Sequence, residues 1–134
     1  MVQTCLELVV FYLNNYEKKI KPLGPYSQYI YRNHTLYSSG QIAICPETND
    51  LIDTNIFDET HQIMKNIKEI LMSENLDFEN IVKTTIFIVD MSCYEIVNEV
   101  YKSYFKNRFP ARETVEVKGL PANANIEISF IAHK

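Results

Sequence analysis

The sequence contains no tryptophan and only three histidines, three cysteines and three glycines among its 134 residues. The histidines, His34, His61 and His133, are far apart, and H-x-x-H, H-E-x-x-H and Cys/His clusters are absent. A zinc site is therefore not expected. The chain also lacks G-x-x-x-x-G-K, G-x-G-x-x-G and G-x-S-x-G. These absences argue against a phosphate-binding loop, a dinucleotide-binding turn and a nucleophile elbow.

The cysteines are odd in number and scattered. Cys5, Cys45 and Cys93 form no C-x-x-C pair, so a disulfide framework is not predicted and a reducing compartment is the simplest interpretation. Each cysteine is expected to act as a small buried hydrophobe rather than as a nucleophile. Cys-His nucleophilic catalysis has no positive support in the sequence.

Long apolar runs are also missing, so no segment is expected to span a bilayer. The stretch Leu6–Leu13 is apolar but short, contains Glu7 and has no basic leader, which favours a β-strand over a signal peptide. No targeting segment is evident, and the cytosol is the expected compartment. The formal net charge of −4 argues against a nucleic-acid backbone as the main partner.

The length suits one domain with one core, and no repeat or linker divides residues 1–134. The first half of the chain has the composition of strands, with a hairpin turn at Arg32–His34 and a turn cluster at Pro46–Asp50. The predicted strands in this half are Leu6–Leu13, Tyr26–Tyr31 and Thr35–Ser39, the last extended by Gln41–Cys45.

The periodicity then changes. Apolar residues recur every three or four positions from Ile56 to Leu71, which predicts an amphipathic helix over residues 55–74 with Asp53 or Thr54 as its cap. The β-branched run Ile81–Val89 predicts a strand buried on both faces.

A second helix is predicted to begin with a capping box formed by Ser92 and Glu95, followed by an apolar stripe from Ile96 to Phe105. Two further strands are predicted over residues 113–118 and 126–132. The order β-β-β-α-β-α-β-β indicates an α+β domain with both helices on one face of a mixed sheet. The other face also needs cover, and Tyr and Phe on several strands favour an oligomer that buries it.

Two charged residues near the end of the chain are candidates for a site. Arg112 begins a predicted strand, and strand alternation places Thr114 on the same face. Glu127 lies between Ile126 and Ile128 in an otherwise apolar strand. Residue type alone favours ordinary structural roles, an ion pair for Arg112 and a solvated face for Glu127.

The order of several short segments resembles the RidA family (reactive intermediate deaminase, also called YjgF), from about Ile20 to the C-terminus. Each segment alone is weak evidence, but their order and spacing over most of the chain are specific. The segments are Gly24–Gln28, Ser38–Gln41, Asn66–Ile67, Val82–Phe87, Val97–Tyr101, Phe109–Arg112, Leu120–Pro121 and Ile126–Ile128.

The resemblance implies a fold similar to the trimeric chorismate mutases, in which three subunits pack their sheets into a central barrel and form clefts between neighbours. It also implies an enzyme, a 2-iminobutanoate/2-iminopropanoate deaminase that hydrolyses reactive 2-imino acids to 2-keto acids and ammonia. No metal or organic cofactor is expected, because a protonated imine is already electrophilic.

In such a site Arg112 would bind the substrate carboxylate, and Glu127 would orient a water molecule and take its proton. Two departures from the family pattern stand out. Glu113 follows the arginine where a small residue is usual, although alternation directs it to the other face, and the first nineteen residues are longer than the family core requires. Thr114 stands where cysteine or another small residue is frequent. The family pattern further assigns contacts with substrate to Tyr26, Ser39, Asn98 and Thr114.

Each of these residues also has an ordinary structural interpretation: Tyr26 as a packing aromatic, Ser39 as part of a bend and Asn98 as a polar surface residue. Two other functions remain open. One is an endoribonuclease or translation inhibitor, which the acidic charge disfavours. The other is a non-catalytic trimer that binds small carboxylates or acts as a chaperone, which would need Arg112 but not Glu127.

Overall fold

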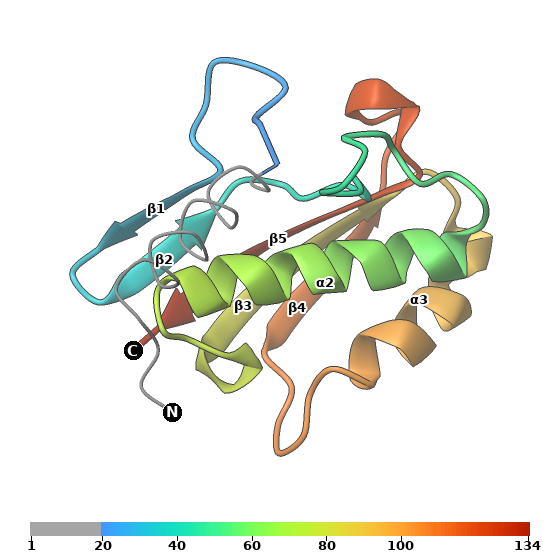
Figure 1. Ribbon diagram of the computed structural model, residues 1–134. Helices are drawn as coiled ribbons and strands as arrows, with labels where there is room; N and C mark the ends of the chain where they lie inside the picture. The colour runs from blue at the N-terminus through green and yellow to red at the C-terminus, as the bar shows by residue number, and fades with distance from the viewer. Residues whose placement is uncertain (1–19) are drawn as a thin grey trace, which may run out of the picture.

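The computed structural model describes residues 20–134, and in this range two helices and five strands form a mixed α+β fold (Figure 1). Cys5 and the strand predicted over Leu6–Leu13 lie outside the described residues. The elements are β1 (Tyr29–Arg32), β2 (Thr35–Ser38), α2 (Ile56–Ser73), β3 (Ile81–Ile88), α3 (Tyr94–Lys102), β4 (Ala111–Glu116) and β5 (Ile126–His133), with short 3-10 turns at Phe78–Asn80, Met91–Cys93 and Pro121–Asn123.

The strands of the sheet are ordered β1-β2-β5-β3-β4. β3 and β4 are parallel, and the other neighbouring pairs are antiparallel. A parallel pair needs a crossover connection, which α3 supplies between β3 and β4. β1 and β2 meet at a two-residue turn, where Asn33 and His34 have φ of 52° and 62°. The predicted hairpin is therefore confirmed, with the positive φ at both positions that a type I′ turn requires.

Both helices pack on one face of the sheet, as the sequence predicts (Figure 1). Alternate residues of the strands point toward these helices and form one apolar cluster with them. Members of this cluster that are no more than 1% exposed include Ile86 and Ile88 of β3, Ile126 and Ile128 of β5, Ile63 and Ile67 of α2, and Val97 of α3.

The opposite face of the sheet, called here the open face, carries no helix in the described part of the chain. The sequence predicted that Ile81–Val89 is a strand buried on both faces. This prediction is wrong for a single chain, because buried and more exposed residues alternate along β3. Apolar side chains nevertheless line this face, with Ile30 52%, Tyr37 51% and Val115 42% exposed. A surface of this kind is typical of a protein-protein interface.

Several strands differ from the predicted bounds. β1 begins at Tyr29, so Tyr26 lies in the preceding loop. β2 ends at Ser38, whose Oγ accepts a hydrogen bond from the Phe130 N–H at 2.8 Å and so replaces a backbone acceptor in the ladder. Residues 41–45 form two isolated bridges instead of a strand extension. β4 begins and ends two residues earlier than predicted, because its pairing with β3 starts at Ala111.

The N-terminus of α2 also differs from the prediction. The cap is Asn55, whose Oδ1 accepts a hydrogen bond from the Asp58 N–H at 2.8 Å, and neither Asp53 nor Thr54 takes this role. Thr54 instead donates its hydroxyl to the Asp58 carboxylate at 3.0 Å. Three polar residues in succession each offered a cap, and local periodicity does not distinguish among them.

The capping box predicted at Ser92 is wrong. Asp90 accepts a hydrogen bond from the Ser92 N–H at 2.9 Å and begins a 3-10 turn, so α3 starts with Cys93 at its N-cap and no side-chain cap bond. The helix ends at Lys102, before the end of the predicted apolar stripe. Ile96, expected in that stripe, is 41% exposed.

Two residues of α2 differ in burial, so we expect their substitution by alanine to change the free energy of unfolding by different amounts. We expect Ile67→Ala to lower the free energy of unfolding by about 2–5 kcal/mol, because Ile67 is 1% exposed and its loss leaves a cavity between helix and sheet. Met72→Ala is the matched control, since Met72 is 55% exposed and surface substitutions change stability by about 0.5 kcal/mol. Chemical denaturation at one fixed protein concentration measures both. Equal losses would contradict the packing described here.

Candidate active site

Arg112 lies on β4, at the edge of the sheet, with its side chain on the helix-covered face. Its register partner on β3 is Thr84, which is buried and shares a 2.8 Å hydrogen bond with the hydroxyl of Tyr101 on α3. The Arg112 Nη2 donates to Asn98 Oδ1 at 2.8 Å and to the Tyr94 hydroxyl at 3.2 Å. Helix α3 therefore covers the arginine and fixes its guanidinium.

The contacts of Arg112 come from one face of α3. Tyr94, Asn98 and Tyr101 are spaced i, i+4 and i+7, which places them on one side of a helix. The Arg112 guanidinium carbon is 4.9 Å from the centre of the Tyr101 ring and 5.7 Å from that of Tyr94. These distances fit cation-π contacts.

The partners of Arg112 are all uncharged. Neither hydrogen-bond acceptor is a carboxylate, and no ion pair joins Arg112 to another residue of the described range 20–134. Its positive charge is thus held in place without being neutralised. Such a group favours binding of an anion, above all a planar carboxylate that can accept two N–H bonds.

Thr114 lies two residues beyond Arg112 on the same face of β4, as strand alternation predicts. Its Oγ1 is buried and has no hydrogen-bond partner in the described part of the chain. Buried hydroxyls nearly always have a partner, so this atom leaves a polar position beside the arginine for a ligand or a water molecule to fill.

Glu127 lies on β5 and its side chain is on the open face. Its register partner is Phe87, which lies between the fully buried Ile86 and Ile88 and so points away from the helices. The Glu127 side chain is half-buried, and this burial raises the pKa of its carboxyl above the ordinary value. A raised pKa brings the group closer to the range in which a carboxyl takes and returns a proton during catalysis.

Gly40 provides the space for the Glu127 side chain. A Cβ atom added at Gly40 would collide with the Glu127 carboxyl group and would lie 2.7 Å from its Cγ. No glycine of the described residues has a positive φ, so Gly40 is needed here for its small size and not for its backbone conformation. Any side chain at position 40 must displace the carboxylate.

Tyr26 and Ser39 lie on the loops next to Gly40. Tyr26 lines a small open pocket together with Gly40, and its hydroxyl accepts a hydrogen bond from the Leu23 N–H at 3.2 Å. The Ser39 hydroxyl donates to the Ser27 carbonyl at 2.6 Å, which ties the two loops together. Gly40 thus lies next to Glu127 and also lines a pocket with Tyr26, and the Ser39 bond to Ser27 holds this loop.

Glu113 points away from Arg112, as strand alternation predicts. It faces Thr85 across the β3–β4 pair, with a 2.7 Å ion pair to Lys83 and a 3.0 Å hydrogen bond from the Thr85 hydroxyl. Hydrogen bonds from Lys83 and Thr85 lower the pKa of the Glu113 carboxyl. The charge beside Arg112 in sequence therefore has its own partner on the other face.

The predicted site residues form two half-sites on opposite faces of one sheet. The arginine half-site contains Arg112 with Asn98 and Thr114. The glutamate half-site contains Glu127 with Gly40, and Tyr26 lines a pocket next to Gly40. Strand register separates Arg112 from Glu127 within one chain. If both act on one substrate, a second chain must supply one half-site.

Three further residues of these half-sites were not identified from the sequence. Tyr94 and Tyr101 share the i, i+4, i+7 spacing with Asn98, and that spacing could have pointed to them. Gly40 gave no such signal, because its contact with Glu127 joins positions far apart in the chain. Within residues 20–134, no three His, Cys, Asp or Glu side chains are arranged to hold a metal ion, and no helix is long and apolar enough to cross a membrane.

The contact between Gly40 and Glu127 generates a testable prediction. Gly40→Ala is expected to push the carboxyl toward solvent and to lower the Glu127 pKa toward its ordinary value, because burial is the cause of the raised pKa. NMR titration of the side-chain carboxyl carbon measures this pKa. Gly119→Ala is the matched control, since an added Cβ there meets no atom within 4 Å. An unchanged Glu127 pKa in Gly40→Ala would contradict the contact.

Comparison with known proteins places this chain in a family. A family model described as Endoribonuclease L-PSP matches residues 16–134. The Homo sapiens protein named 2-iminobutanoate/2-iminopropanoate deaminase is 43% identical over 110 residues, which cover 82% of this chain and 80% of the human one. The Arabidopsis thaliana protein named Reactive Intermediate Deaminase A, chloroplastic, is 43% identical over 116 residues, which cover 87% of this chain but 62% of the plant protein.

A solved structure from Yersinia pestis, described as a protein of unknown function of the conserved Rid protein family, has the same fold. It is 45% identical to this chain, with a TM-score of 0.84, and the match covers 88% of this chain and 94% of that one. Since the family model spans most of the sequence and these relatives exceed 40% identity over most of it, the chain belongs to the RidA family, which the family model describes as Endoribonuclease L-PSP.

Proposed function

We propose that this protein is a deaminase that hydrolyses 2-imino acids, such as 2-iminopropanoate and 2-iminobutanoate, to 2-keto acids and ammonia. The observation that carries the proposal is the fixed, unneutralised guanidinium of Arg112. The name of the human relative supports the substrate class. A net charge of −4 favours a small carboxylate over an RNA backbone as the anion that Arg112 binds.

Arg112 binds the substrate carboxylate in this mechanism. Because Asn98, Tyr94 and Tyr101 already hold the guanidinium, little freedom is lost when the anion binds. Binding the carboxylate fixes the adjacent C=N carbon in one position. Fixed geometry between a reactive carbon and a water molecule removes a large part of a reaction barrier.

Glu127 acts on that water molecule. The carboxylate takes one proton as the water oxygen bonds to the imine carbon, and the C=N electron pair moves to nitrogen. The resulting carbinolamine then collapses: Glu127 returns the proton to nitrogen, the C–N bond breaks and ammonia leaves. The C=O bond forms as the hydroxyl proton passes to the Glu127 carboxylate, which transfers it to the departing ammonia or to solvent. Burial that raises the Glu127 pKa suits both transfers, because the group must accept and later release the same proton.

A homotrimer with sites between subunits would bring the two half-sites together. The open face supplies apolar side chains for such an assembly, and Glu127 lies on this face. Arg112 lies on the edge strand β4, where a neighbouring subunit can approach it. We therefore propose that each site combines the arginine half-site of one subunit with the glutamate half-site of the next.

The deaminase proposal predicts loss of activity in two variants. A threonine dehydratase coupled to this protein should release 2-oxobutanoate faster with the wild type, and Arg112→Ala and Glu127→Gln should each reduce that acceleration about 100-fold or more. Arg108→Ala and Glu69→Gln are matched controls on exposed positions and should retain activity. Absence of acceleration by the wild type would exclude the deaminase function. Loss in Arg112→Ala alone would support a binding role for Arg112 and would contradict the role of Glu127 in proton transfer.

The shared site predicts complementation between two inactive variants. Arg112→Ala and Glu127→Gln chains, unfolded together in equal amounts and refolded, should recover about a quarter of the wild-type activity, because random mixing gives that share of sites two intact half-sites. Each variant refolded alone should remain inactive. Sedimentation analysis should show trimers in all samples. Trimers that contain both variants but have no activity would contradict a site shared between subunits.

A further inference from the structure

We infer that the Tyr94 hydroxyl is a second hydrogen-bond donor to the carboxylate that Arg112 binds, and that it makes this position selective for carboxylates over neutral groups. The inference rests on the proposed function and extends it. Tyr94 is the first residue of α3, one helical turn before Asn98, and its hydroxyl is 3.2 Å from Arg112 Nη2.

The Tyr94 hydroxyl already accepts one hydrogen bond, but it does not donate one within the described residues. It accepts the hydrogen bond from Arg112, whereas its own O–H has no acceptor among the described residues. A hydroxyl can accept and donate at the same time. Since the proton of Tyr94 remains to be donated, an anion bound to Arg112 is the acceptor that the geometry provides.

Distance and charge also support this role. The Tyr94 oxygen is 3.2 Å from Arg112 Nη2, so its hydroxyl lies beside the guanidinium, whose Nη1 and Nε have no hydrogen-bond acceptor among the described residues and remain available to a carboxylate. The guanidinium polarises the hydroxyl that accepts from it, and polarised chains of hydrogen bonds strengthen one another in a partly desolvated site. Both side chains are half-buried. Tyr94 thus adds a donor without adding a charge.

Tyr94 could instead compete with the carboxylate for an N–H group of Arg112, and its removal would then increase the affinity for the ligand. Nη2 carries two N–H groups, and Asn98 and Tyr94 are its two acceptors. If Tyr94 occupied an N–H that the carboxylate needs, its removal would strengthen binding. If Tyr94 donates to the carboxylate, its removal weakens binding. The sign of the change in affinity therefore separates the two roles.

The test compares Tyr94→Phe with the wild type by calorimetric titration with 2-oxobutanoate, the proposed product, and with 2-oxobutanamide, its neutral analogue. We expect the Kd for 2-oxobutanoate to rise about 10-fold, as for loss of one hydrogen bond to a charged group. The Kd for the amide should change by less than about twofold. A merely structural role for Tyr94 would affect both ligands alike.

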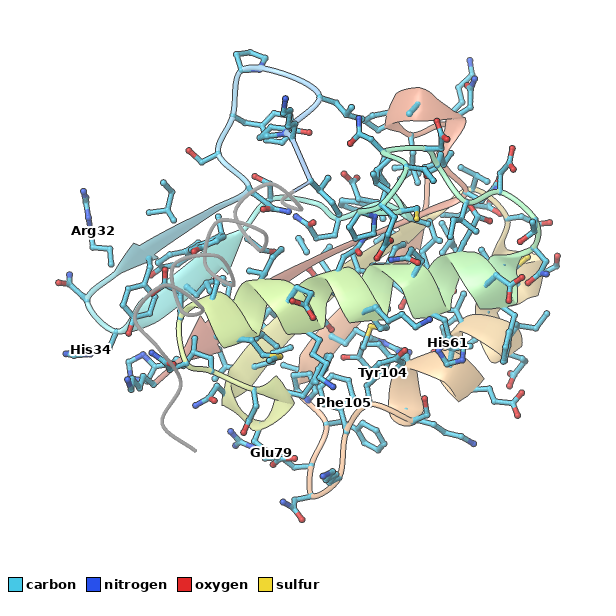
Figure 2. The ribbon with its side chains drawn as sticks, viewed as in Figure 1. Arg32, His34, His61, Glu79, Tyr104 and Phe105 are labelled. Atoms are coloured by element: carbon cyan, nitrogen blue, oxygen red, sulfur yellow. The ribbon has the colours of Figure 1, made fainter. Side chains whose placement is uncertain are left out.

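Tyr104→Phe is the matched control. The Tyr104 hydroxyl lies 2.8 Å from the His61 Nδ1 (Figure 2) and makes no hydrogen bond to the arginine half-site within the described residues. Its loss should leave both Kd values unchanged. Thermal unfolding verifies that each variant is folded, and Tyr94→Phe retains the ring beside Arg112.

Two results of this titration would contradict the proposed role of Tyr94. An unchanged or lower Kd for 2-oxobutanoate in Tyr94→Phe would overturn it, and so would failure of the wild type to bind 2-oxobutanoate. The coupled dehydratase assay is a separate measurement. A wild type that binds 2-oxobutanoate with the expected Tyr94 dependence but does not accelerate imine hydrolysis would disprove the deaminase function and leave the carboxylate site intact.

Discussion

The candidate site depends on Arg112, whose guanidinium is fixed by uncharged groups and keeps its positive charge unpaired within the described residues. The parallel β3–β4 pair requires a crossover, and α3, which supplies it, lies over Arg112. Uncharged groups on one face of α3 then fix the guanidinium, which donates hydrogen bonds to Asn98 and Tyr94 and lies against the ring of Tyr101. A carboxylate in their place would satisfy the arginine and remove its affinity for a ligand.

In the glutamate half-site, the small size of Gly40 gives the Glu127 carboxyl its position, and no hydrogen bond to that carboxyl is present among the described residues. Gly40 gives the Glu127 carboxyl a place against the loop that follows β2, and the resulting burial disfavours its charged form. This loop leaves the sheet because Ser38 bonds to β5 through its side chain and ends the ladder there. The end of β2 thus places Gly40 next to the Glu127 carboxyl, in a loop that also lines a small pocket with Tyr26.

The sequence predicted what depends on local periodicity and missed what depends on contacts between distant segments. Alternation correctly placed Arg112 with Thr114 and sent Glu113 to the other face, and the three- and four-residue spacing located α2. The cap at Asn55, by contrast, was one of several adjacent polar candidates. The contact of Gly40 with Glu127 could not be inferred, because the two residues are far apart in the chain, whereas the helical spacing of Tyr94 with Asn98 was a signal that the prediction did not use.

The separation of Arg112 and Glu127 on opposite faces has a chemical consequence. Had both side chains been on one face of one chain, they could have formed an ion pair. Such a pair would lower the pKa of the carboxyl and occupy the donors of the guanidinium. A sheet between them prevents this pairing during folding. In the proposed trimer, the substrate would lie between the two charges, so that Arg112 binds its carboxylate and Glu127 acts on water.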